Sequence, residues 1–307
     1  MKTSPVVLEI KDPRLLDLVS QDAVIEQLCT GFQFTEGPIW NPKEQCLYFS
    51  DVPGNIRRRW SAKDGVIEIR NPSNKCNGMT YDASGNLYVC EHLTSSLILE
   101  SPQGERKVLA SHWQAKELNS PNDVVVRSDG SVYFTDPTYG RMPVFGLERE
   151  QALPFQGLYR LNPGGDLNLE ADDFAQPNGL CFSPDEKLLY VNDTVRAHIR
   201  VFEVSADGAL TGGRVFAEAI GDGVFEGGVV DGMKCDERGN VYVTGPRGIW
   251  VFSPAGELLG VVQMPEHAGN LNWGGQDWRE LYCACSTSIY RLRAKVQGSP
   301  CPYWNMV

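Results

Sequence analysis

The chain is short of positive charge. Its 307 residues include 28 Lys and Arg against 39 Asp and Glu, a net charge of −11. Proteins that bind nucleic acids or anionic membranes need basic patches, so we expect neither partner. No apolar run approaches the roughly 20 residues of a membrane-spanning helix. The N-terminal MKTSPVVLEIKDPR has no long apolar region either, which predicts a cytoplasmic protein without a signal peptide.

The sequence also lacks the common catalytic motifs. It contains no GxSxG, no HExxH and no GxxxxGK[ST], so these nucleophile, zinc and nucleotide sites are not expected. Four histidines are scattered without the spacing of metal ligands. Nine cysteines are an odd number and mostly fall inside apolar runs. We expect them to be small buried side chains in a reducing compartment.

A sixfold repeat dominates the sequence. Six short runs are centred on a tyrosine: CLYFSD, NLYVCE, SVYFTD, LLYVND, NVYVTG and ELYCAC. In the first five repeats a polar residue opens the preceding apolar run, 11 or 12 positions before the tyrosine. We call these residues the openers: Glu36, Asn77, Asn122, Asn178 and Asp231. The sixth repeat departs from the pattern, with Gly269 and Asn270 near that position.

The repeat predicts the fold. Its paired runs flank turns rich in Asp, Gly and Pro, which indicates hairpins, and later runs supply further strands. Openers follow one another at 41, 45, 56 and 53 residues, and units of this size with four short strands are typical of propeller blades. We therefore predict an all-β, six-bladed β-propeller with four-stranded blades. We expect one domain over 1–307, with blades at roughly 31–300, an N-terminal extension over 1–30 and a short helix near 12–19.

Propeller geometry would bring the openers together. Each precedes the innermost strand of its blade, so all should stand at one mouth of the central channel. Acidic residues three positions after a tyrosine should face the same mouth, and they are Asp51, Glu91, Asp136 and Asp193. His92, beside Glu91, is the histidine for which we expect a role in the pocket.

The opener side chains suggest a metal site. The carboxylates of Glu36 and Asp231, together with asparagine amides, offer the oxygen ligands that Ca²⁺, Mg²⁺ and Mn²⁺ prefer. Without a cation, one of two close carboxylates would have to take up a proton. The alternative is that Asn and Asp simply stabilise the turns before the strands, as they often do.

Several segments resemble the gluconolactonase/regucalcin (SMP-30-like) family of six-bladed propellers. They are FTEGPIW (34–40), LNSPNDVVVRSDGSVYFTDPTYG (118–140), QPNGLCFSPDEKLLYVNDT (176–194), DGMKCDERGNVYV (231–243) and NLNWGG (270–275). The resemblance covers roughly residues 25–293.

The resemblance implies an enzyme that hydrolyses sugar lactones such as gluconolactone, with a small-molecule lactone as its partner. It implies one divalent metal ion held by Glu36, Asn178 and Asp231, with calcium the first choice and zinc, manganese or magnesium the alternatives. Asp231 would also be the catalytic base, and Asn122 would contact the substrate. Animal members carry a sugar-binding arginine where this chain has Ser120, so Tyr139 becomes a candidate for a replacement contact with the substrate. His92 is a further candidate for substrate contact because of its expected place at the mouth.

Two other interpretations stay open. A phosphotriesterase-type hydrolase could use the same metal on P=O instead of C=O. A propeller can also bind a metal or a partner protein without catalysis, since fold alone does not fix function.

Overall fold

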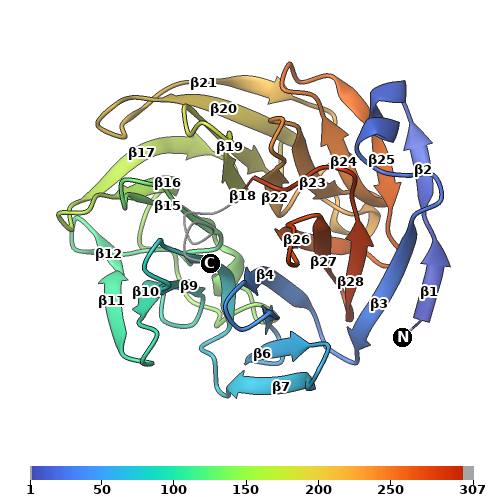
Figure 1. Cartoon of the computed structure of the whole chain (residues 1–307). Coiled ribbons are helices and arrows are strands. Elements are labelled where there is room, and N and C mark those ends of the chain that lie inside the picture. Colours follow the sequence, from blue (N-terminus) through green and yellow to red (C-terminus); the bar gives the residue numbers. More distant parts are fainter. Residues whose placement is uncertain (1, 300–307) are drawn as a thin grey trace.

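Six antiparallel sheets form a ring around a central channel, and the strand that opens each sequence repeat is the innermost strand of its sheet (Figure 1). The structure is a computed structural model in which residues 2–299 are described. The paired runs of the sequence account for the sheets, because each pair closes across a tight turn into a hairpin. The predicted six-bladed β-propeller is confirmed.

The first four blades each have four strands in chain order, counted outward from the channel. The first blade contains β4 (Thr35–Asn41), β5 (Cys46–Asp51), β6 (Ile56–Ser61) and β7 (Gly65–Arg70). The second contains β8 (Cys76–Tyr81), β9 (Leu87–Glu91), β10 (Ser96–Glu100) and β11 (Arg106–Ala110). The third follows a small hairpin and contains β14 (Val124–Val126), β15 (Val132–Asp136), β16 (Gln156–Leu161) and β17 (Leu167–Phe174). The hairpin strands are β12 (His112–Trp113) and β13 (Lys116–Glu117). The fourth blade contains β18 (Pro177–Phe182), β19 (Leu188–Asp193), β20 (His198–Val204) and β21 (Leu210–Ala217).

The last two blades also use strands from the start of the chain, drawn in blue beside β25 and β28 in Figure 1. The fifth blade contains β22 (Met233–Cys235), β23 (Val241–Gly245), β24 (Gly248–Phe252) and β25 (Leu258–Gln263), with β2 (Val7–Ile10) at its outer edge. The sixth contains β26 (Ala268–Gly274), β27 (Glu280–Cys285), β28 (Ser288–Arg293), β3 (Val24–Thr30) and β1 (Lys2–Pro5).

The N-terminal segment differs from the expectation that residues 1–30 lie outside the blades. β3 pairs with β28 in an antiparallel register that sets Ile25 opposite Leu292. Backbone hydrogen bonds between the two ends of the chain therefore close the ring. The segment near 12–19 contains the 3-10 helix η1 (Pro13–Asp17), and the side chain of Asp12 accepts a hydrogen bond from the backbone N–H of Arg14 at 2.9 Å.

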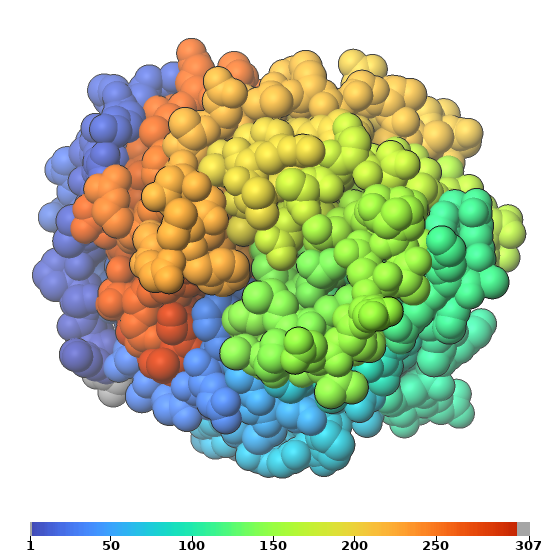
Figure 2. Space-filling view, turned by 180° about the vertical axis from the view of Figure 1, so that it is seen from behind, coloured from blue at the N-terminus to red at the C-terminus, as the bar shows by residue number. Residues whose placement is uncertain are grey.

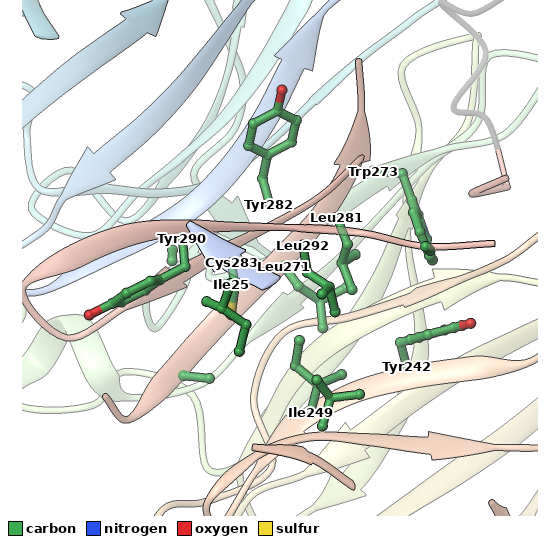
Figure 3. Close-up of a cluster of buried hydrophobic side chains, with 14 of the residues drawn as sticks. Ile25, Tyr242, Ile249, Leu271, Trp273, Leu281, Tyr282, Cys283, Tyr290 and Leu292 are labelled. Carbon is green, nitrogen blue, oxygen red and sulfur yellow. The ribbon is translucent and has the colours of Figure 1, made fainter. Parts of the chain in front are cut away.

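The repeated tyrosines pack between neighbouring blades. Tyr282 of the sixth blade stacks on Trp40 of the first, with ring centroids 5.2 Å apart and planes inclined by 11°. Tyr242 of the fifth blade meets Trp273 of the sixth edge-on at 5.1 Å. Figure 3 shows Tyr242, Trp273 and Tyr282 among the buried side chains of these last two blades. Each tyrosine thus contacts the end of the next inner strand, which explains why the two features recur together.

The cysteines within residues 2–299 form no disulfide, and all of them except Cys29 are buried. They act as small apolar side chains in the strands, as the sequence predicts. None of the helices in this range has the length and apolar character needed to cross a membrane.

Candidate active site

Local backbone features direct the openers into the channel. The register of the first hairpin shifts beside the opener position in the first, second, fourth and sixth blades. Such irregularities bend a strand and re-aim its side chains. Glycine follows most openers because adjacent inner strands meet there. A Cβ atom on Gly37, for example, would lie 2.0 Å from the carbonyl oxygen of Asn77.

All five openers line one pocket at a mouth of the channel. The pocket has a volume of about 320 Å³, including its open entrance. In Figure 2 the β15–β16 loop (lime green) and the β21–β22 loop (gold) flank a recess near the centre of this face. The openers and the two further candidates for substrate contact, His92 and Tyr139, all lie in this pocket. The lining residues are Phe34, Glu36, Val52, Asn77, His92, Asn122, Tyr139, Phe145, Asn178, Phe225 and Asp231.

Three asparagines bond in series across the pocket. Nδ2 of Asn77 donates to Oδ1 of Asn122 at 2.6 Å, and Nδ2 of Asn122 donates to Oδ1 of Asn178 at 2.6 Å. Asn178 donates in turn to the hydroxyl oxygens of Tyr139 and Thr194, at 3.2 and 3.1 Å. Oδ1 of Asn77 is left buried without a hydrogen-bond partner in the described structure. Since such an atom is costly to bury alone, it is a candidate ligand atom.

Two carboxylates complete the pocket. Oε2 of Glu36 accepts hydrogen bonds from the backbone N–H of Gly37 and from Nδ2 of Asn270, both at 2.9 Å. Burial raises the pKa of Glu36 to about 7. Burial and the nearby charge of Glu36 also raise the pKa of Asp231 well above its usual value. The two groups therefore resist being ionised together unless a cation lies between them.

A third buried carboxylate adds to this negative charge. Asp123 directly follows an opener, and burial raises its pKa. Nζ of Lys234, on β22, lies 3.9 Å from Oδ2 of Asp123. When all are ionised, three carboxylates and one ammonium group leave two negative charges uncompensated. Within residues 2–299 no group of three or more His, Cys, Asp or Glu side chains could hold a metal ion. A cation here would therefore need asparagine oxygens, which suit a hard divalent ion.

His92 and Tyr139 are engaged with the protein itself. Nδ1 of His92 donates to the carbonyl oxygen of Phe145 at 2.9 Å, and its Nε2 lies 3.3 Å from Nδ2 of Asn77. Burial lowers the pKa of His92 to about 4, so the imidazole is neutral at pH 7. The hydroxyl of Tyr139 donates to Oγ1 of Thr194 at 2.8 Å. His92 thus fastens the β15–β16 loop, and Tyr139 presents its ring to the pocket.

The acidic residues at the ends of the second strands, which we expect at this mouth, are not among the residues that line the pocket. Asp51, Asp136 and Asp193 accept backbone N–H groups from the segment that leads into the inner strand of the same blade. Glu91 accepts from Nδ2 of Asn74 and Oγ1 of Thr94, both at 2.9 Å. These carboxylates hold loops in place, which is a structural role.

Sequence reasoning missed several residues of the site. Asn270, which bonds Glu36, lies 12 positions before Tyr282, so its spacing matches that of a sixth opener. Thr194 follows the acidic end of β19 and carries no repeat signal of its own. The remaining wall residues are Phe34, Val52, Phe145 and Phe225. Val52 has the same place in its repeat as His92 and Thr194, directly after the acidic residue, whereas Phe145 and Phe225 come from irregular loops.

The fold and the site together define a class: a six-bladed β-propeller with a polar pocket on its central axis. The family model described as the SMP-30/gluconolactonase/LRE-like region matches residues 34–287. The chain belongs to this family, as its sequence motifs indicate.

Individual relatives agree with this assignment. A gluconolactonase of Zymomonas mobilis is 32% identical over 305 residues, which cover 93% of this chain and 85% of the relative. The solved structure of a gluconolactonase from Xanthomonas campestris is 30% identical with a TM-score of 0.85, covering 96% of this chain and 98% of the other. Regucalcin from Agrobacterium tumefaciens, described as a calcium-binding protein, has the same fold at 18% identity, with a TM-score of 0.73 and coverage of 89% and 94%.

Proposed function

We propose that the protein is a metal-dependent lactonase that opens sugar lactones such as gluconolactone. The convergence of Glu36, Asn178 and Asp231 in one buried pocket carries the proposal. The similarity to two proteins named gluconolactonase supports a lactone as the substrate.

The pocket residues fit one divalent cation. Glu36, Asn178 and Asp231 would hold it, and the orphaned Oδ1 of Asn77 offers another oxygen. The two uncompensated negative charges match the charge of the ion. Calcium is the first choice because all of these ligands are oxygens, and a regucalcin with this fold is described as calcium-binding.

In the proposed mechanism a bound divalent ion supplies electrostatic stabilisation of the negative charge that develops on the lactone carbonyl oxygen. Asp231 accepts a proton from the attacking water, because burial and a neighbouring carboxylate increase its proton affinity. The new acyl C–O bond forms as the acyl bond to the ring oxygen breaks, and the proton passes from Asp231 to that oxygen. Asn122 orients the substrate. The apolar rim of the pocket, formed by Phe34, Val52, Phe145 and Phe225, limits access of bulk water.

A pH-stat assay with glucono-δ-lactone tests this function, with the spontaneous rate subtracted. We expect turnover that a chelator abolishes and added Ca²⁺ restores. Undiminished turnover in chelator would contradict the metal requirement. An organophosphate triester is assayed in parallel, and activity on it alone would favour the phosphotriesterase alternative. Calcium binding without hydrolysis of either substrate would favour a non-catalytic propeller.

A further inference from the structure

The polar groups of the pocket leave little to bind the hydroxyl groups of a sugar. Both nitrogens of His92, the amides of Asn122 and Asn178 and the hydroxyl of Tyr139 already have protein partners. Oδ1 of Asn77 has no hydrogen-bond partner among the described residues, and the remaining acceptors in the pocket are the carboxylates of Glu36 and Asp231. Together with Asn178, these residues are the ones that the proposed function assigns to the metal and the water.

The rest of the pocket wall is apolar. Phe34, Val52, Phe145 and Phe225 line it above the polar groups. The rings of Phe34 and Phe145 meet edge-on with centroids 5.4 Å apart, and the ring of Phe225 lies 6.4 Å from that of Tyr139. A substrate whose carbonyl reaches the carboxylates therefore places its remaining atoms against aromatic and aliphatic side chains.

The apolar character continues outward onto the two loops that flank the pocket. Exposed apolar side chains occur on the β15–β16 loop and on the β21–β22 loop, which Figure 2 shows on either side of the recess. They are Met142, Val144, Leu147, Val224 and Phe225, with 42–59% of their surface exposed. Isolated exposed apolar residues are ordinary, whereas a group of them around a pocket marks a binding surface.

No cationic side chain is among the residues that line this pocket in the described structure. Nζ of Lys75 donates to the carbonyl oxygen of Val144 at 2.6 Å, and Arg149 donates to the carbonyl oxygen of His92 at 3.2 Å. These cations hold the loop from outside the pocket. A phosphate group on a substrate would therefore meet carboxylates and phenyl rings without a compensating charge.

We propose that the same centre hydrolyses a second class of substrate, uncharged lactones with an alkyl or aryl substituent on the ring, and that it rejects phosphorylated lactones. The proposal rests on the lactonase function above. The reaction is the same hydrolysis: water adds to the acyl carbon, the ring C–O bond breaks, and the proton of the water ends on the released alkoxide oxygen. The apolar rim holds the substituent while the carbonyl meets the polar groups below.

The test compares δ-decalactone with δ-valerolactone, which differ only in a pentyl chain. Burying two of its methylene groups is enough to raise kcat/KM about tenfold, and we expect at least that gain for the wild-type protein. Phe225→Ala and Phe145→Leu should each reduce the gain roughly threefold or more, because each removes apolar surface at the rim. Ile69→Ala changes an exposed residue of β7 and serves as the control that leaves the gain unchanged.

Glucono-δ-lactone and its 6-phosphate separate the possible outcomes. We expect the phosphate to lower kcat/KM at least about tenfold, as an unpaired charge would. If the protein hydrolyses glucono-δ-lactone but gives equal kcat/KM values for δ-decalactone and δ-valerolactone, this inference is overturned and the proposed function is not. Equal rates for the phosphorylated and unphosphorylated sugars would overturn the exclusion of phosphate. Failure to hydrolyse any lactone would overturn the proposed function and this inference with it. Circular dichroism establishes that each variant is folded.

Discussion

The two mouths of the channel are built from the same six inner strands, yet among the described residues the carboxylates and amides of the openers gather at one mouth. At the candidate active site the strand openers converge, and Glu36 and Asp231 are buried together without a direct ion pair to any described residue. The opposite mouth holds a larger cavity of about 600 Å³ lined by later residues of the same strands, including Ile39, Thr80 and Cys181.

Glu186, the one carboxylate among the described residues that line this cavity, already accepts a hydrogen bond from the backbone N–H of Ser128 at 2.9 Å. The size of a cavity therefore does not identify the site in this molecule. What distinguishes the active mouth is that charged and amide oxygens meet there with atoms still unsatisfied.

The largest expected difference between the mouths is catalytic. Asp231→Asn removes the proposed base and should lower kcat on glucono-δ-lactone by about 10³-fold, within the range for general-base catalysis. Glu186→Gln makes the matching change at the opposite mouth, and we expect its kcat to stay within about twofold of the wild type. Steady-state rates in saturating calcium make the measurement. Comparable losses in the two variants would erase the distinction between the mouths.

Metal affinity should show the next largest difference. Glu36→Gln keeps the shape of the side chain but removes one of the charges proposed to hold the ion, and calcium should bind at least roughly 100-fold more weakly. Isothermal titration calorimetry measures this change. Thr80→Ala at the opposite mouth is the control. Unchanged affinity in Glu36→Gln would remove this residue from the metal site.

The buried carboxylate of Glu36 should also make the stability of the metal-free protein depend on pH. In the metal-free protein the pKa of Glu36 is about 7, above its usual value of 4.5, because of burial. The folded state therefore binds a proton more tightly than the unfolded state. The contribution of the protonated Glu36 to the free energy of unfolding is fully present below about pH 4.5. It is lost as the pH rises to about 7, a loss on the order of 3 kcal/mol. Chemical denaturation of wild type and Glu36→Gln without metal should diverge across this range, and parallel profiles would contradict the assignment.

The smallest effect is expected from the hydroxyl of Tyr139, which contacts Thr194 and Asn178. Tyr139→Phe removes the hydroxyl that bonds Thr194 and Asn178, so the Asn178 amide is held less firmly. We expect kcat/KM to fall about fivefold, the cost of roughly one hydrogen bond. A loss as large as that of Asp231→Asn would instead give Tyr139 a direct part in the chemistry.

The sequence predicts the fold and the convergence of the openers because both depend on a regular repeat. The tyrosine spacing fixes the hairpins, and the ring then brings residues such as Glu36 and Asp231 to one mouth. The spacing of 12 positions before Tyr282 also points to Asn270 as a sixth opener, although the sixth repeat departs from the pattern of the other five.

The features that the sequence did not reveal depend on contacts distant in the chain or on irregular loops. Asp136 lies at the end of a second strand, where the sequence pattern alone suggests a residue facing the channel mouth. The structure shows instead that its carboxylate oxygens accept hydrogen bonds from backbone N–H groups. Pairing of β3 with β28 joins residues more than 250 positions apart. Phe145 and Phe225 belong to the irregular β15–β16 and β21–β22 loops, outside the repeated strands, so no repeat pattern points to them.

Anomalous diffraction from crystals grown with Mn²⁺ as a substitute for calcium tests the central claim most directly. We expect one strong peak within bonding distance of Glu36, Asn178 and Asp231, and none at the opposite mouth. An empty map between Glu36 and Asp231 at saturating Mn²⁺ and Ca²⁺, in crystals of a protein that still opens lactones, would contradict it.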